Sequence, residues 1–129
     1  MGIHLSAGGV HNSIALTALA QLSERWGVPK SKRHLLIGAP ASTVSHWYTK
    51  LNKGTADDSE PLDATTMERI SHLVAIYDGL HRLVPSSADA WMNRENLAFG
   101  GRKPLDVILS GQVVDLINVR QYVDRVLHQ

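Results

Sequence analysis

Side chains able to perform catalysis or to bind a metal are scattered along this chain. Its seven histidines form no HxxxH or HExxH pair, the spacing that brings two imidazole groups of one helix to one zinc ion. The chain contains no cysteine, which excludes a disulfide framework, a thiolate metal site and a cysteine nucleophile. It also lacks the GxSxG turn that exposes a nucleophilic serine. We therefore expect that the protein is not an enzyme and holds neither a metal nor a cofactor.

Two further patterns resemble reactive sites but lack the residues that would complete them. Asp57-Asp58 lies among Gly, Ser and Pro residues, where a carboxylate pair is more simply solvated charge than an acid–base site. Gly100-Gly101 precedes a predicted helix, as phosphate-binding loops do, but no Walker spacing and no Lys-Ser or Lys-Thr follows it. Asp106 would also repel an anion at that place. Neither pattern predicts chemistry on a substrate.

The distribution of charge favours a polyanion as one partner. Residues 1–56 carry six basic side chains against one acidic side chain, a net charge of +5, whereas residues 57–129 carry seven against eleven, a net charge of −4. Such asymmetry is typical of a nucleic-acid-binding part joined to a body with another task, although chance segregation would look the same. Basic groups suit phosphates and short polar groups suit base edges. The candidate DNA contacts are Lys30, Lys32, Arg33, Ser42, Thr43, Ser45, His46, Lys50 and Lys53.

Apolar residues recur at spacings of three and four, so we predict an all-α fold. In the basic part we expect helices over residues 12–26, 31–38 and 40–51. A short helix, Gly38 in the turn and a second helix held by Val44 and Trp47 form a helix-turn-helix pattern. His34 stands where this motif usually has a small side chain, so the two helices are expected to pack less closely or to bind DNA weakly. A purely structural three-helix core is the alternative.

The second part is expected to hold a long helix over 64–84, one turn over 88–92 and helices over 105–109 and 112–127. Asp63 or Thr65 would cap the long helix, and Trp91 would join the core. The last helix is apolar around most of its circumference, which favours a partner chain as its second cover, unless neighbouring helices of the same chain cover it. Residues 52–61 are rich in Gly, Pro, Ser and Asp, and they predict a linker between domains at 1–56 and 57–129.

The composition and the start of the chain indicate the compartment. The 129 residues are 43% hydrophobic and 19% charged, as in ordinary soluble domains. No run of about 18 apolar residues occurs, and Met1 to Val10 lacks the basic flank and apolar stretch of a secretory signal. We expect a cytoplasmic protein without a membrane partner.

Ordered motifs between Asp63 and Val126, together with the helix-turn-helix pattern ahead of them, resemble antitoxins of the Xre/MbcA/ParS type. The motifs are Met67-Glu68-Arg69-Ile70-Ser71, Ile76-Tyr77, Leu80-His81, Trp91, Phe99-Gly100-Gly101-Arg102-Lys103-Pro104-Leu105-Asp106, Leu109-Ser110-Gly111 and Val119-Arg120-Gln121-Tyr122-Val123-Asp124. They match the toxin-binding domain of these antitoxins and cover about half of the chain.

The resemblance implies the antitoxin of a type II toxin-antitoxin pair. Its cognate toxin would carry a RES domain and consume NAD, and the C-terminal domain of the antitoxin would block the NAD site. The N-terminal part would dimerise, bind operator DNA and repress the operon. Toxin contacts would then fall on Phe99, Gly100, Gly101, Arg102, Lys103, Asp106, Arg120, Asp124 and Arg125.

A second interpretation belongs to another class of function. The chain could be a free-standing Xre-like transcriptional regulator whose C-terminal module only dimerises or senses a ligand. An NAD-processing enzyme is disfavoured because the chain lacks a recognisable catalytic constellation.

Overall fold

The computed structural model describes residues 12–53 and 62–127, and it confirms the all-α fold. In order along the chain, the elements are α1 (Asn12–Arg25), the 3₁₀ turn η1 (Lys30–Lys32), α2 (Arg33–Ile37), α3 (Ala41–Asn52), α4 (Ala64–Leu83), α5 (Ala88–Trp91), the 3₁₀ turn η2 (Leu97–Phe99), α6 (Pro104–Ile108) and α7 (Val113–Leu127). Within the described ranges the only β-type pairing is an isolated bridge between Asn96 and Arg102. Met1 to Val10, Asp57-Asp58 and most of the predicted linker lie outside these ranges.

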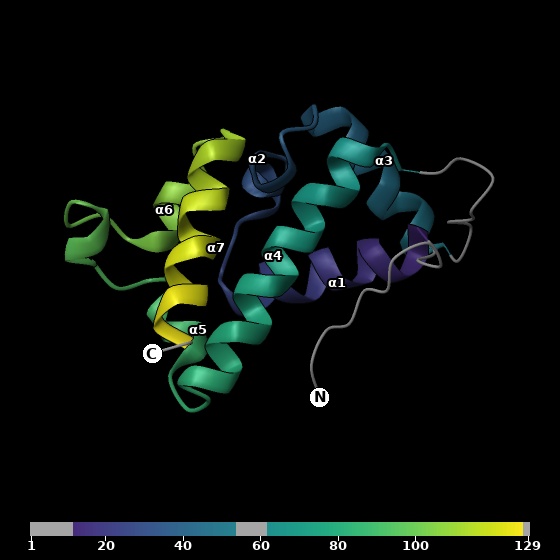
Figure 1. The fold of residues 1–129 in the computed structure, drawn as a ribbon. Coiled ribbons are helices and arrows are strands. Elements are labelled where there is room, and N and C mark those ends of the chain that lie inside the picture. The colour runs from purple at the N-terminus through teal and green to yellow at the C-terminus, as the bar shows by residue number, and fades with distance from the viewer. Residues whose placement is uncertain (1–11, 54–61, 128–129) are drawn as a thin grey trace.

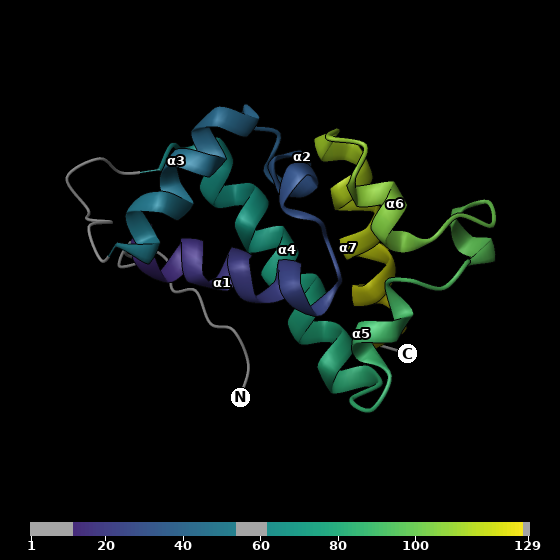
Figure 2. The same ribbon diagram turned by 180° about the vertical axis from the view of Figure 1, so that it is seen from behind.

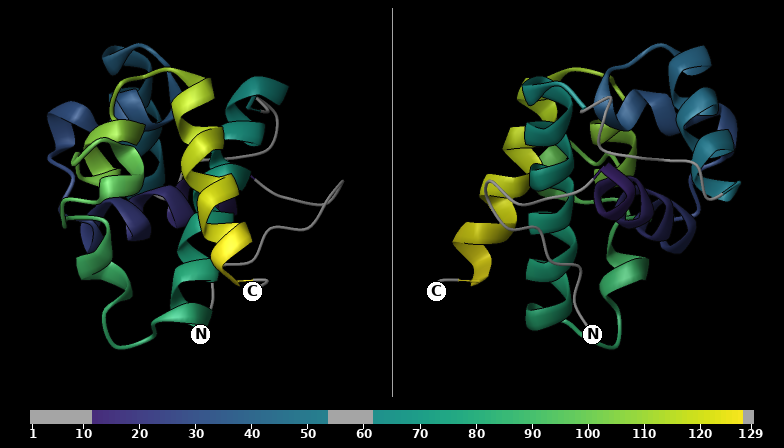
Figure 3. Two further views of the ribbon diagram at one scale, coloured as in Figure 1. Left: turned by 60° about the vertical axis from the view of Figure 1, so that its left-hand side comes forward. Right: turned by 90° about the vertical axis from the view of Figure 1, so that its right-hand side faces the viewer.

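Helix α4 is the central element of the fold. It contacts α1, α2, α5 and α7, and it lies side by side with α7 (Figure 3). Its apolar face, which includes Ile70, Leu73 and Leu80, is almost completely buried. Gly79 allows the close approach of α7, because a Cβ atom at this position would lie 2.8 Å from Cγ1 of Val123. Asp63, one of the two predicted caps, is the N-cap of α4, and its side chain accepts a hydrogen bond from the Thr66 amide.

The N-terminal helices pack on one another and on α4. Leu19, Leu22 and Trp26 of the first helical segment are fully buried, and α1 crosses α4 (Figures 1 and 2). One hydrophobic core contains these residues together with residues of α4, α6 and α7. The two predicted domains therefore share a core, and their division at residue 56 stays a prediction.

The C-terminal helices differ from the prediction in small respects. Met92 is fully buried in the core, whereas Trp91 is half-buried and packs against it. Pro104 occupies the first turn of α6, a position where a proline needs no backbone N–H partner. Leu116 and Val119 on α7 are buried, while Val113 and Val114 in its first turn are exposed. Helices of the same chain thus cover much of α7, and a partner chain on the rest of it stays a prediction, as does the homodimer.

The arrangement separates two surfaces. Helix α3 lies at one end of the molecule, and the segment that carries η2 projects from the other end, beyond α6 (Figure 1). Across the described ranges, no helix is long and apolar enough to span a membrane.

Candidate functional site

A tight turn at Gly38 joins α2 and α3, the two helices of the predicted helix-turn-helix. Gly38 adopts the left-handed conformation with φ 65°, and its amide donates to the His34 carbonyl, which closes α2. Val44 is 3% exposed and anchors α3 to the core. Ser42, Ser45 and His46 are exposed, whereas Thr43 is half-buried. The structure therefore gathers three of the four predicted base-reading side chains on the outer surface of α3.

Two further residues of α3 share this exposed surface. Asn52 lies two turns after Ser45 and is exposed, and an amide of this type can read adenine. Thr49 is also exposed, and its hydroxyl donates to the Ser45 carbonyl at 2.9 Å. The sequence interpretation missed both, although the helical repeat that placed Ser42 and Ser45 outward also places Thr49 and Asn52 outward.

The predicted phosphate contacts divide into two groups. Lys30, Lys32 and Lys53 are exposed at the ends of the motif, whereas Lys50 is half-buried. Arg33 is also half-buried, and its guanidinium has partners within the chain. Its Nε donates to the Val28 carbonyl at 3.3 Å, and its Cζ lies 5.8 Å from the centre of the Tyr48 ring. The lysines at positions 30, 32 and 53 are thus the groups best placed to meet a polyanion.

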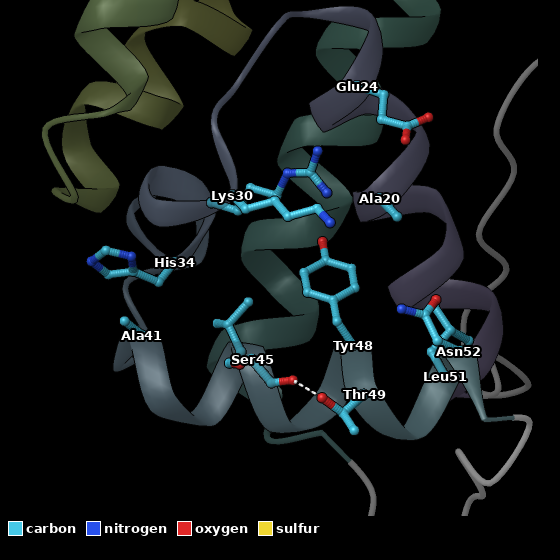
Figure 4. Close-up of a pocket in the computed structure, with 12 residues that line it drawn as sticks. Ala20, Glu24, Lys30, His34, Ala41, Ser45, Tyr48, Thr49, Leu51 and Asn52 are labelled. Atoms are coloured by element: carbon cyan, nitrogen blue, oxygen red, sulfur yellow. Dashed lines mark hydrogen bonds between the residues drawn. The ribbon is translucent and has the colours of Figure 1, made fainter.

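A pocket of about 350 Å³ lies between α1, η1, α2 and α3 (Figure 4). Tyr48 points from α3 toward the side that carries Lys30, while the ring of His34 points away from the other labelled side chains. Burial raises the pKa of the Tyr48 hydroxyl, and the nearby Arg33 charge partly offsets this rise, so the phenol is neutral at pH 7. His34 is one of the residues that line the pocket, and its expected effect on the packing of the two helices stays a prediction.

A second candidate surface is the loop between α5 and α6. The two ends of this loop meet where the backbone N–H of Asn96 donates to the Arg102 carbonyl at 3.1 Å. The Asn96 side chain accepts from the Ala98 amide at 2.9 Å, which caps η2. Gly100 and Gly101 follow in the left-handed region, with φ values of 67° and 81°, and turn the chain back toward the body. The loop is therefore a closed, internally bonded turn.

An aromatic cluster fixes this loop to the rest of the protein. The Phe99 ring lies 5.3 Å from Tyr122 of α7 and 6.4 Å from Trp91 of α5, measured between ring centres. Trp91 and Tyr122 stack at 6.1 Å. Phe99 is half-buried in this cluster, so it positions the loop. The sequence interpretation placed Phe99 among the partner contacts and did not foresee its contact with Tyr122.

The other predicted toxin contacts surround the cluster. Gly100, Arg102, Lys103 and Asp106 are exposed on the loop and on α6, and Gly101 is half-buried. On α7, Arg125 is exposed and Arg120 is paired. Arg120 donates from Nη1 to Nδ1 of His72 at 2.8 Å, and its Nε lies 3.7 Å from Asp124. The structure thus joins Arg120 and Asp124 in one polar group with His72.

Side chains suited to metal binding stay apart. In the two described ranges, no three His, Cys, Asp or Glu residues come together as metal ligands would. The surfaces on α3, on the loop and on α7 present charged and polar groups without a convergent reactive set. Such surfaces can bind macromolecules.

Comparisons with known proteins agree with this interpretation. Residues 72–128 match the family described as Antitoxin Xre/MbcA/ParS C-terminal toxin-binding domain. The chain is 38% identical over 112 residues to the uncharacterized protein y4oB of Sinorhizobium fredii (strain NBRC 101917 / NGR234), covering 84% of this chain and 81% of that protein. A chain in the crystal structure of the M. tuberculosis MbcT-MbcA toxin-antitoxin complex has a similar fold. It is 20% identical with a TM-score of 0.52, and the match covers 88% of this chain and 93% of that chain.

The matched domain identifies the chain as an antitoxin of a toxin-antitoxin system. The chain belongs to the Xre/MbcA/ParS antitoxin family.

Proposed function

We propose that this antitoxin binds a RES-domain toxin that consumes NAD and neutralises it by occluding its active site. We further propose that its helix-turn-helix binds operator DNA and represses its own operon in the cytoplasm. The observation that carries the first proposal is the match of residues 72–128 to a toxin-binding domain, because this range contains both the projecting loop and α7. The chain itself would perform no chemistry.

The toxin-binding face is proposed to combine the loop, α6 and α7. Arg102, Lys103 and Asp106 offer exposed charges from the loop and from α6, and Arg125 offers another from α7. The aromatic cluster that joins Phe99 to Tyr122 holds these elements together. A partner would therefore meet a preformed surface, and preformed surfaces lose little conformational entropy on binding.

The DNA-binding face is proposed to be the outer surface of α3. Ser42, Ser45 and His46 can reach base edges, while the exposed lysines around the motif can contact phosphates. Homodimers of such motifs bind two half-sites, so a dimer is part of this proposal. Because α3 and the projecting loop lie at opposite ends of the molecule, toxin and DNA could bind together (Figure 1).

Two charge-reversal variants test whether toxin binding and DNA binding use separate faces. The double substitution Arg102→Glu, Lys103→Glu should abolish co-purification with the protein encoded by the adjacent reading frame and leave DNA binding intact. The double substitution Lys30→Glu, Lys32→Glu should do the opposite. Each variant is the matched control of the other, since both reverse two exposed basic groups.

The results would also distinguish an antitoxin from a free-standing transcriptional regulator. DNA binding by the unmodified chain without any association with the neighbouring protein would favour a free-standing transcriptional regulator. Equal loss of both activities in both variants, with the helical content unchanged, would contradict the division into two faces.

A further inference from the structure

Leu97 is an exposed apolar side chain in an unusual position. It is 93% exposed, whereas the other exposed large apolar residues in the described ranges, Ile14, Val113 and Val114, are between 36% and 58% exposed. Leu97 is also the first residue of η2, and the segment that carries η2 projects beyond α6 (Figures 1 and 2). An apolar side chain that protrudes from the body can enter a recess in a partner.

The loop holds Leu97 in one place by contacts on both sides of it. The carbonyl of Asn96 accepts hydrogen bonds from the amides of Phe99 and Gly101, each at 3.0 Å, and the carbonyl of Leu97 accepts from Gly100 at 3.1 Å. Two residues after Leu97, the Phe99 ring packs 5.3 Å from Tyr122. The backbone is therefore ordered before any partner binds, which reduces the entropic cost of inserting the side chain.

We propose that Leu97 is an anchor residue for the toxin and inserts into an apolar pocket whose rim is acidic. This inference rests on the proposed function, since the toxin is the partner. The acidic rim follows from the charges of residues 94–103, the segment that carries Leu97, because Arg94, Arg102 and Lys103 are exposed and Glu95 is the one acidic residue of this segment. An anchor of this kind fills a pocket at the centre of an interface, where a few residues supply most of the affinity.

A second copy of this chain fits the same surface poorly. A symmetric contact centred on this loop would bring the exposed basic residues Arg102 and Lys103 of the two copies toward one another. Like charges opposed across an interface destabilise it. Leu97 also lies inside the range 72–128 that matches a toxin-binding domain. Both observations favour the toxin as the occupant.

Substitutions at Leu97 test the inference directly. The dissociation constant of the complex with the protein encoded by the adjacent reading frame would be measured for the unmodified chain and for single variants. Leu97→Asp should weaken binding by at least about 100-fold, Leu97→Ala by about 10-fold, and Leu97→Met by less than about 5-fold, since Met also fills an apolar pocket. Ile14→Asp is the matched control, because Ile14 is also an exposed apolar residue but lies on α1, and it should leave the affinity unchanged.

The outcomes separate this inference from the proposed function. The thermal unfolding midpoint of Leu97→Asp should equal that of the unmodified chain, because the side chain contributes little to the core. Tight binding by the unmodified chain and equally tight binding by Leu97→Asp would overturn the anchor and leave the antitoxin function standing. If Leu97→Asp dissociates a dimer of this chain while the affinity for the toxin is unchanged, the toxin anchor is overturned and Leu97 contacts a second copy of the chain instead. Absence of binding by the unmodified chain would overturn the proposed function, and the anchor with it.

Discussion

The guanidinium of Arg69 on α4 donates a hydrogen bond to the carbonyl oxygen of Gly111 at 3.0 Å. Gly111 lies in the turn before α7, and it adopts the left-handed conformation with φ 82°. The same guanidinium lies against the turn between α2 and α3, because a Cβ atom on Gly38 would be 2.7 Å from Arg69 Nη1. One side chain thus touches both the turn that orients α3 and the turn that starts α7.

Gly38→Ala should destabilise the protein more than Gly27→Ala. Both glycines have positive φ values, 65° and 72°, which cost an alanine about 1–2 kcal/mol. Only at Gly38 would the new methyl group also displace Arg69, whereas nothing lies within 4 Å of a Cβ at Gly27. Urea unfolding should therefore show a larger loss of the free energy of unfolding for Gly38→Ala. In an Arg69→Ala background the two losses should become equal, and a difference that persists there would contradict this explanation.

Arg69→Met should lower the free energy of unfolding by about 1.5–3 kcal/mol, the usual contribution of a hydrogen bond to a charged group. Methionine retains most of the apolar stem, so the loss would report the polar contact with Gly111. Arg82→Met is the control, since Arg82 is exposed on the same helix and its loss should change stability by less than about 0.5 kcal/mol. Equal effects of the two substitutions would show that the contact with Gly111 does not stabilise the fold.

Asp63→Ala should lower the free energy of unfolding by about 1 kcal/mol at pH 7, because it removes the N-cap of α4. The pKa of Asp63 is lowered from its ordinary value of 3.8, mainly because its carboxylate accepts hydrogen bonds from Thr66. A carboxylate with a lowered folded-state pKa stabilises the fold above the unfolded pKa, and this contribution is lost as the pH falls through the folded pKa. The difference between the unmodified chain and Asp63→Ala should therefore shrink below about pH 4.

Asp63→Asn separates the cap from its charge. An asparagine oxygen also accepts from the Thr66 amide, so this variant should retain most of the stability at pH 7. Its advantage over Asp63→Ala should stay constant between pH 7 and pH 3, measured by urea unfolding at several pH values. An advantage that disappears at low pH would mean that the carboxylate charge of Asp63 is not the titrating group.

Loss of exposed lysines should weaken DNA binding without changing its sequence preference. Lys32→Ala and Lys53→Ala should each lower the slope of log K against log salt by about 1, because each lysine would neutralise one phosphate. Arg94→Ala on the projecting loop is the control and should leave the slope unchanged. Fluorescence anisotropy over a series of salt concentrations measures these slopes, and an unchanged slope in both lysine variants would exclude them as phosphate contacts.

Loss of a base-reading side chain should instead change which sequences bind. His46→Ala and Asn52→Ala should each relax the preference at one or two base positions, by about 1–3 kcal/mol per position. Selection from a random DNA pool, followed by sequencing, would display the change. Unchanged preferences in both variants would place the recognition surface elsewhere than on α3.

Local patterns predicted most of the helices. Gly38, Asp63 and Pro104 act at the positions where their backbone and hydrogen-bonding properties placed them, because caps and turns depend on neighbours in the chain. The buried face of α4 followed from the spacing of its apolar residues for the same reason. These features need no knowledge of the tertiary arrangement.

Features that depend on distant parts of the chain were not predicted. Leu97 has the residue type of a core position, and only the folded loop shows that it is exposed. Arg33 and Arg120 are of a residue type that usually lies on the surface, yet both bind other parts of the chain. Arg33 bonds the Val28 carbonyl five residues earlier, and Arg120 bonds His72 on α4. The role of Arg69 between two glycine turns depends on α4 lying beside both of them, which no periodic pattern encodes.

The most direct test of the account is a measurement of NAD consumption by the neighbouring protein with and without this chain. We expect the two proteins to purify as a stable complex that consumes no NAD, and the activity to appear when the antitoxin is removed. Adding back the unmodified chain in equimolar amount should suppress it again, whereas the double variant Arg102→Glu, Lys103→Glu should not. NAD consumption that continues undiminished in a stable complex would contradict neutralisation by occlusion of the active site.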